Sequence, residues 1–327
     1  MADGYLPDEE MLAGLFALPS DEWEEIFALA GRVTEAHKGN VVFVRGIVEF
    51  SSHCRRECAY CGLNRFNTKL ERFRLTDDQI VETALSGFAA GYKTAVLQSG
   101  EDAVFTAERL AGIVSRIKHQ APMAITMSAG EMPREDYAIL REAGCDRYLL
   151  KHETADETLY RTLHPESELS DRVACLRSLK ELGFETGGGF MIGLPGQTAR
   201  TIAKDLLLLR SIPCDMAGIG PFIAHPDTPL GGCENGSPYV ARQAVALARL
   251  LLPDANLPAT TSLGVLSKTE LSKIFSGGAN VIMKKLNPPA LREQYNIYPA
   301  EFSKCGDTVA ERKELEQMLT SLGKTFD

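Results

Sequence analysis

Three cysteines lie close together in a sequence whose other cysteines are scattered. Cys54, Cys58 and Cys61 follow the spacing C-x3-C-x2-C, and five further cysteines stand far from them and from one another. Thiolates hold iron–sulfur clusters in proteins, and a [4Fe–4S] cubane normally takes four of them. Three thiolates in one loop leave one iron free for a small chelating ligand, as radical chemistry with S-adenosylmethionine (SAM) requires. The spacing therefore predicts one cluster, held by three cysteines and open at its fourth iron.

Two other interpretations of this motif stay open. A structural zinc ion would need four ligands, and His53 could be proposed as the fourth. Neighbouring residues at the end of a strand tend to point to opposite sides, which disfavours His53 and Cys54 sharing one ion. The cysteines could also be unrelated buried thiols, because free cysteine is often buried. Tyr60 is expected to contact the adenine of a bound nucleotide or to pack within the loop.

The motif follows the first of eight short apolar runs, which alternate with amphipathic helical stretches. Thr76–Gln79 is a capping box, and Pro133 opens a helix that stops at Gly144. Ser20 is expected to cap an N-terminal helix, and Ser170 to precede another. The candidate strands are Val41–Phe50, Thr94–Gln98, Ala124–Ser128, Arg147–Leu150, Glu185–Ile192, Met216–Ile219, Leu257–Thr261 and Asn280–Met283.

Eight strand–helix repeats predict an α/β fold of the (β/α)8 barrel type, whose active sites form at the carboxyl ends of the strands. We expect an N-terminal helical extension over residues 1–39, the barrel over 40–285 and a helical flank over 286–327. The chain of 327 residues has a formal net charge of −9, which disfavours nucleic-acid binding. It has no apolar run of membrane-spanning length and an acidic N-terminus, so we expect a cytoplasmic protein.

Polar side chains recur on one face of several predicted strands. Residues two apart share a face, which groups Arg45 with Glu49, and Lys151 with Glu153; Thr126 lies on a face of the third strand. Buried charges need partners or a polar ligand. The pattern predicts a binding cavity in the barrel. Because alternation does not tell which face points inward, an internal ion-pair network and polar residues that face the helices are the alternatives. Glycines in the fifth strand, at 187–189, are typical of close approach by another molecule or of tight packing.

The cysteine motif, with an aromatic residue before its last cysteine, resembles the signature of the radical SAM superfamily. Further stretches are similar to the HydE family of [FeFe]-hydrogenase maturases. These stretches are Val96–Asp102, Asp146–Ala155, Gly220–Pro229, Leu257–Thr261 and Gly278–Met283. The resemblance covers about residues 40–299 in order.

The resemblance to this family assigns roles to particular residues. It implies that Glu153 binds the amino group or ribose of SAM, that Arg172 binds its carboxylate, and that Ser99 lies near its methionine part. Met216 would also lie beside the cofactor, and the glycine run in the fifth strand makes Gly188 a further candidate cofactor contact. The implied substrate-binding residues are Arg45, Thr126, Lys151, Thr260, Thr261, Tyr295 and Tyr298.

The same resemblance implies a reaction and partners. A 5′-deoxyadenosyl radical would attack a small, cysteine-derived organometallic substrate supplied by HydG, and the product would pass to HydF under anaerobic conditions. A ferredoxin or flavodoxin would supply electrons. Lysine stands at 151 where arginine is expected, and Cys305 has no cysteine after it. We therefore expect one cluster only.

Other functions remain open. The chain could be a HydE-like paralogue or a mutase similar to methylornithine synthase, acting on another small amino-acid-type substrate. Biotin synthase needs a second cluster, for which no second group of cysteines is present. A non-catalytic iron–sulfur carrier belongs to a different class. Such a carrier would not cleave SAM.

Overall fold

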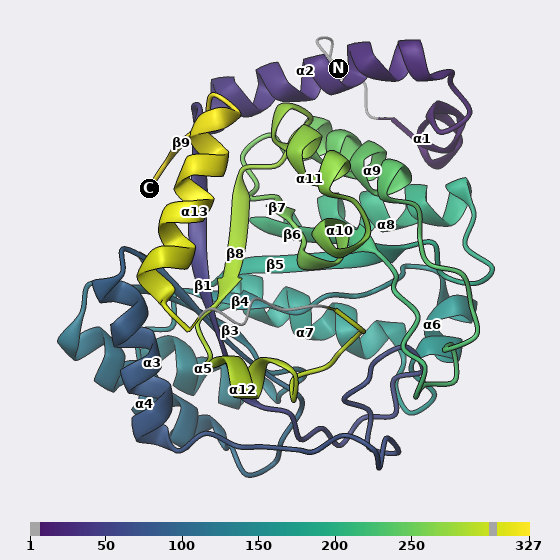
Figure 1. Cartoon of the computed structure of the whole chain (residues 1–327). Helices are drawn as coiled ribbons and strands as arrows, with labels where there is room; N and C mark the ends of the chain where they lie inside the picture. Colours follow the sequence, from purple (N-terminus) through teal and green to yellow (C-terminus); the bar gives the residue numbers. More distant parts are fainter. Residues whose placement is uncertain (1–6, 301–305) are drawn as a thin grey trace.

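The fold is a ring of parallel strands surrounded by helices, seen here in a computed structural model that describes residues 7–300 and 306–327. All eight predicted strands are present, and strands that follow one another in the sequence pair in the sheet, except for the sixth and seventh. The strands are β1 (Val41–Ser51), β2 (Thr94–Ser99), β3 (Ala124–Ser128), β4 (Arg147–Leu149), β5 (Glu185–Ile192), β6 (Met216–Pro221), β7 (Pro258–Ala259) and β8 (Val281–Lys285). The predicted (β/α)8 architecture is confirmed (Figure 1).

The barrel closes on one side by a ladder and on the other by a single bridge. β8 pairs with β1, which joins the last strand to the first. Between β6 and β7 there is an isolated parallel bridge from Met216 to Asn256, with the Ala217 N–H donating to the Asn256 carbonyl over 3.1 Å. The predicted strand over 257–261 is shorter than expected, because Thr260 and Thr261 already begin the next helix. The ring is therefore nearly closed.

Helices cover the outside of the ring, as expected for parallel strands joined by right-handed crossovers. They are α1 (Glu9–Leu15), α2 (Ser20–Lys38), α3 (Asp77–Ala89), α4 (Ala107–Gln120), α5 (Arg134–Glu142), α6 (Glu157–Leu163), α7 (Leu169–Glu181), α8 (Ala199–Ser211), α9 (Pro238–Leu251), α10 (Thr261–Leu266), α11 (Lys268–Lys273), the 3-10 helix η1 (Ile274–Ser276), α12 (Pro289–Arg292) and α13 (Thr308–Ser321).

The helix boundaries test the capping predictions. The capping box of α3 is present, with the Thr76 hydroxyl accepting from the Gln79 N–H and the Gln79 side chain accepting from the Thr76 N–H. The predictions for Ser20 and Ser170 were wrong. Pro19 precedes α2, and α7 begins at Leu169, after Glu168. Each serine lies within the first turn of its helix, where it is helical itself and cannot adopt the extended backbone of a cap.

The two flanks pack onto different parts of the barrel. α2 lies across the end of the ring opposite the loop that follows β1 (Figure 1). A short strand that the sequence did not predict, β9 (Thr325–Phe326), pairs in parallel with the start of β1 at Val41 and Val42. The division at residues 39 and 285 stays a prediction. No helix in the described ranges is both long and apolar enough to cross a membrane.

Candidate active site

A cavity of about 340 Å³ opens inside the barrel at the carboxyl ends of its strands. This volume falls in the range of small-molecule sites. Twelve of the sixteen predicted site residues line it. They are Cys54, Cys58, Tyr60, Cys61, Ser99, Lys151, Glu153, Arg172, Thr260, Thr261, Tyr295 and Tyr298.

The three cysteines lie in a loop that backbone contacts hold at the cavity mouth. The Glu101 N–H points at the Cys54 sulfur over 3.4 Å, and the Arg55 N–H donates to the Glu101 carbonyl over 3.0 Å. A Cβ on Gly100 would lie 2.4 Å from the His53 carbonyl oxygen and 2.7 Å from the Cys54 Cβ. Glycine at 100 therefore lets β2 end directly against the cysteine loop.

Glu153 has an unusual backbone conformation. It is the non-glycine residue with positive φ, 64°, among those the structure describes. Its N–H donates to the Gly189 carbonyl over 3.0 Å, and its carbonyl accepts from the Met191 N–H over 3.1 Å. Strain of this kind costs about 1–3 kcal/mol and persists where the surroundings enforce it, often at functional sites. These bonds to β5 hold the Glu153 carboxylate at the cavity wall.

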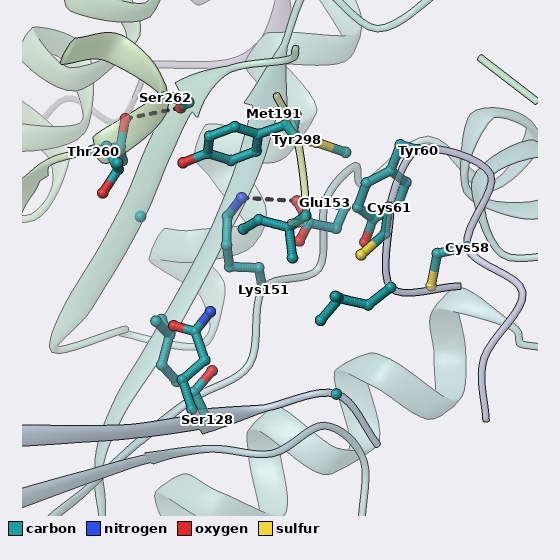
Figure 2. Close-up of a pocket in the computed structure, with 18 of the residues that line it drawn as sticks. Cys58, Tyr60, Cys61, Ser128, Lys151, Glu153, Met191, Thr260, Ser262 and Tyr298 are labelled. Carbon is teal, nitrogen blue, oxygen red and sulfur yellow. Dashed lines mark hydrogen bonds and ion pairs between the residues drawn. The ribbon is translucent and has the colours of Figure 1, made fainter. Parts of the chain in front are cut away.

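Lys151 pairs with this carboxylate. Its ammonium lies 2.9 Å from Glu153 Oε2, and the dashed line in Figure 2 marks the pair. The Lys151 side chain is 28% exposed and the Glu153 side chain 11%, so both remain accessible from the cavity. A ligand that bound Glu153 would compete with Lys151 for the same oxygen atoms.

Arg172 is fixed by a charged network. Its Nε donates to Glu131, and its Nη1 donates to the Lys151 carbonyl over 2.7 Å. Arg56 joins Glu131 to Glu101 through two contacts of 2.6 Å. The sequence analysis did not identify Arg56, Glu101 or Glu131. Because loops after three different strands supply them, no local spacing could have revealed the network.

Tyr60 lies in an aromatic and apolar wall beside Cys58 and Cys61 (Figure 2). Its hydroxyl lies 3.2 Å from His164 Nε2, and the two rings meet edge to face with centroids 5.5 Å apart. Its ring packs against a small apolar cluster that contains Met191 and Phe222. Burial raises the pKa of the Tyr60 hydroxyl. The tyrosine therefore offers a neutral, oriented aromatic surface.

Four predicted residues lie outside the cavity lining. Arg45 and Met216 contact each other below it, with Arg45 Nη1 3.2 Å from the Met216 sulfur. Thr126 is buried, and no partner of its hydroxyl is found among the described residues. Gly188 faces outward, since a Cβ there would lie 2.7 Å from the Leu209 side chain of α8. The cofactor and substrate roles of these four residues stay predictions.

Neighbouring protein explains the glycine run of β5. A Cβ on Gly187 would lie 2.8 Å from the Leu149 side chain and 2.9 Å from that of Met216. Gly189 has φ 149°, and a Cβ there would lie 2.2 Å from the Gly218 carbonyl oxygen. Of the two predicted explanations, tight packing accounts for these glycines.

Two further charged residues line the cavity. Glu49 of β1 and Lys285 of β8 form an ion pair of 2.9 Å. Strand alternation grouped Glu49 with Arg45 on one face without deciding which face points inward, and the sequence analysis did not identify Lys285. The predicted binding cavity and one of its alternatives, an internal ion pair, are therefore both present.

Comparison with known proteins identifies the fold and its chemistry. Residues 48–209 match the Radical SAM superfamily. The chain is 47% identical over 278 residues to the [FeFe] hydrogenase maturase subunit HydE of Thermotoga maritima, covering 85% of this chain and 80% of that protein. The chain belongs to the HydE family of radical SAM proteins.

More distant relatives share the same fold. The 3-methylornithine synthase of Methanosarcina acetivorans is 29% identical over 264 residues, covering 80% of this chain and 75% of that protein. The crystal structure of methylornithine synthase (PylB) superposes with a TM-score of 0.82 at 25% identity, covering 99% of this chain and 95% of that chain. Radical SAM membership implies a [4Fe–4S] cluster and SAM.

The chemistry of the three thiols fits a cluster. Burial raises the pKa of Cys58 to about 12, and it raises the pKa values of Cys54 and Cys61. Mutual repulsion of the sulfurs contributes to the shifts of Cys58 and Cys61. Thiolates at this place therefore need a positive partner such as iron. The described residues contain no group of three or more His, Cys, Asp or Glu arranged to hold a metal ion; a cubane instead gives each thiolate a different iron.

Proposed function

We propose that the chain is a HydE-type enzyme of [FeFe]-hydrogenase maturation that cleaves SAM reductively. The observation that carries the proposal is the shared cavity, in which the three cysteines lie together with Glu153 and Arg172. The identity of 47% to a HydE protein supports the same function.

In this proposal Cys54, Cys58 and Cys61 hold one cluster and leave its fourth iron for SAM. When bound, the reduced cluster supplies the electron that splits the SAM sulfonium and yields a 5′-deoxyadenosyl radical. The carboxylate of Glu153 accepts hydrogen bonds from the SAM amino group or ribose. Arg172 donates to the SAM carboxylate, and Tyr60 packs against adenine. Ser99 lies beside the methionine part.

The remainder of the cavity holds a small, cysteine-derived organometallic substrate. Lys151 supplies a positive charge for an anionic group, and the hydroxyls of Thr260, Thr261 and Tyr298 supply hydrogen bonds. The apolar side chains of Met191 and Phe222 help to exclude water from the radical. Binding beside SAM orients the reacting atom of the substrate and limits side reactions.

Partners follow from the proposed function. HydG would supply the substrate, HydF would receive the product, and a ferredoxin or flavodoxin would donate electrons. The proposed function requires neither nucleic acid nor a membrane as a partner. Cys305, the cysteine nearest the C-terminus, lies outside the described residues.

Anaerobic turnover tests this proposal. The reconstituted protein is mixed with dithionite and SAM, first alone and then with the product of HydG, and the nucleosides are identified by mass spectrometry. We expect 5′-deoxyadenosine in the first reaction and an adenosylated product in the second. A protein that binds a cluster but releases no 5′-deoxyadenosine would be an iron–sulfur carrier instead.

A mutase of amino-acid-type substrates is the second candidate. The close superposition on methylornithine synthase over nearly the full length of both chains favours it. It predicts that SAM cleavage couples to a free amino acid and not to the HydG product. Product analysis in the same reactions separates the two candidates.

A further inference from the structure

A carboxylate with an unused oxygen faces the cavity from β1. Glu49 is 2% exposed and lines the cavity, and its Oε1 pairs with the Lys285 ammonium over 2.9 Å. Its other oxygen, Oε2, is buried and has no hydrogen-bond partner among the described residues. A buried carboxylate oxygen without a donor costs free energy, so this atom is suited to a donor supplied by a ligand.

The neighbouring strands fix the position of this carboxylate. β1 and β8 pair with Ile47 opposite Lys285, so the side chains of Glu49 and Lys285 are diagonal neighbours on the inner face. The Asn287 amide then holds the backbone of Glu49 at both ends. Its Oδ1 accepts from the Glu49 N–H over 2.8 Å, and its Nδ2 donates to the Glu49 carbonyl over 2.7 Å.

The buried ion pair between Glu49 and Lys285 does not stabilise the fold by itself. Burial raises the pKa of Glu49 to about 7, even though Lys285 opposes this shift. Burial also lowers the pKa of Lys285, against the attraction of Glu49. Loss of hydration therefore outweighs mutual attraction for both groups, as is common for buried ion pairs. A second cation beside Glu49 would offset this cost.

Two tyrosines line the cavity together with Glu49 and Lys285. Tyr295 and Tyr298 both line the cavity, and the charge of Glu49 raises the pKa of each hydroxyl after burial, the larger cause. The Tyr295 hydroxyl accepts from Gln98 Nε2 over 3.4 Å, and the Lys285 ammonium lies 5.7 Å from the Tyr295 ring. A carboxylate that shares a cavity with tyrosine rings is suited to a protonated amine.

We propose that Glu49, in the cavity that it shares with Tyr295 and Tyr298, is the subsite that receives the amino group of an amino-acid-type substrate. The proposal rests on the function proposed above and specifies which part of the substrate this wall recognises. Glu49 Oε2 accepts the N–H of the amine, while Lys285 remains on Oε1.

Equilibrium binding to the anaerobically reconstituted protein with SAM tests the subsite. The probes are S-methyl-L-cysteine, whose sulfur is capped, and 3-(methylthio)propionate, which lacks the amine. We expect wild-type protein to bind the first probe at least roughly tenfold more tightly, because a hydrogen bond to a charged group is lost in the second. Glu49→Gln should remove most of this preference.

Two further variants make the test specific. Glu270→Gln removes a partly buried carboxylate that pairs with Arg242 outside the cavity, and it should keep the preference. Lys285→Met keeps the Glu49 carboxylate and should keep or increase the preference, which gives a second readout if Glu49→Gln does not fold.

The outcomes separate this inference from the proposed function. The inference is overturned if wild-type protein does not bind S-methyl-L-cysteine, binds both probes equally, or keeps its preference in Glu49→Gln. It is also overturned if Lys285→Met abolishes the preference. SAM cleavage is measured in the same samples, so intact cleavage with any of these results would leave the proposed function standing. If wild-type protein does not cleave SAM, the proposed function itself is overturned.

Discussion

Two lysine–carboxylate pairs line the same cavity at equal separation, and their surroundings differ. Lys151 and Glu153 lie at the end of β4, and Glu49 and Lys285 lie on β1 and β8; each pair is separated by 2.9 Å. The side chains of the first pair are 28% and 11% exposed, whereas Lys285 and Glu49 are 14% and 3% exposed.

This difference between the two pairs suggests how one barrel can bind two ligands, SAM and the substrate. Glu153 is held by β5 in a positive-φ conformation that presents its carboxylate, while the side chain of its partner Lys151 is partly exposed. That pair can exchange partners when SAM binds. Glu49 is fixed by Asn287 and more deeply buried, and its free oxygen accepts a new donor without losing Lys285. We therefore assign Glu153 to SAM, its partner Lys151 to an anionic group of the substrate, and the Glu49–Lys285 pair to the amino group of the substrate.

The largest effect is expected from removing a cluster ligand. Both lysine–carboxylate pairs are proposed to bind ligands of a reaction that needs the cluster. Cys58→Ala should abolish the visible absorption of the cluster and all production of 5′-deoxyadenosine. Two cysteines of the motif would remain, too few for the proposed cluster. Ala substitution of Cys233, which lies outside the motif, is the control. Normal turnover by Cys58→Ala would refute the cluster assignment.

The next largest effect concerns the buried pair and pH. The folded-state pKa of Glu49, about 7, lies above its ordinary value of 4.5, so the folded protein holds the proton more tightly than the unfolded chain. Its contribution to stability is fully present below pH 4.5 and is lost as pH rises to 7. Wild-type protein should lose up to about 3 kcal/mol relative to Glu49→Gln across this window. Urea unfolding at several pH values measures this difference in the free energy of unfolding. A difference that stays constant with pH would contradict the raised pKa of Glu49.

A smaller effect is expected for the Lys151–Glu153 pair. Glu153→Gln keeps the shape of the side chain but removes its charge, so the KM for SAM should rise roughly tenfold or more. The readout is 5′-deoxyadenosine formation against SAM concentration, with Glu270→Gln as the matched control. An unchanged KM would place SAM elsewhere in the cavity.

The smallest effect on SAM chemistry is expected at Lys151. Lys151→Ala frees Glu153 and should spare SAM cleavage without substrate, while the fraction of cleavage coupled to product falls several-fold through loss of one exposed charge. The ratio of adenosylated product to 5′-deoxyadenosine measures this coupling. If both activities fell equally, Lys151 would belong to the SAM site.

The sequence was informative for most signals that depend on one segment of the chain. The spacing of Cys54, Cys58 and Cys61 and the alternation around Glu49 depend on neighbours in one segment, and the eight strands followed from periodicity. The pairing of Glu49 with Lys285 could not be predicted, because strand register sets it between residues 236 apart. The Arg56–Glu131–Arg172 network and β9 depend on distant segments in the same way. Ser20 and Ser170 misled because serine also occurs inside a first turn.

Electron paramagnetic resonance of the reduced, reconstituted protein tests the central claim most directly. A cluster held by three cysteines has one iron open to SAM, so we predict about four iron and four sulfide per chain and a signal that shifts when SAM is added. Protein that stays colourless and iron-free, contains zinc in the cysteine loop, or gives a signal unaffected by SAM would contradict the account.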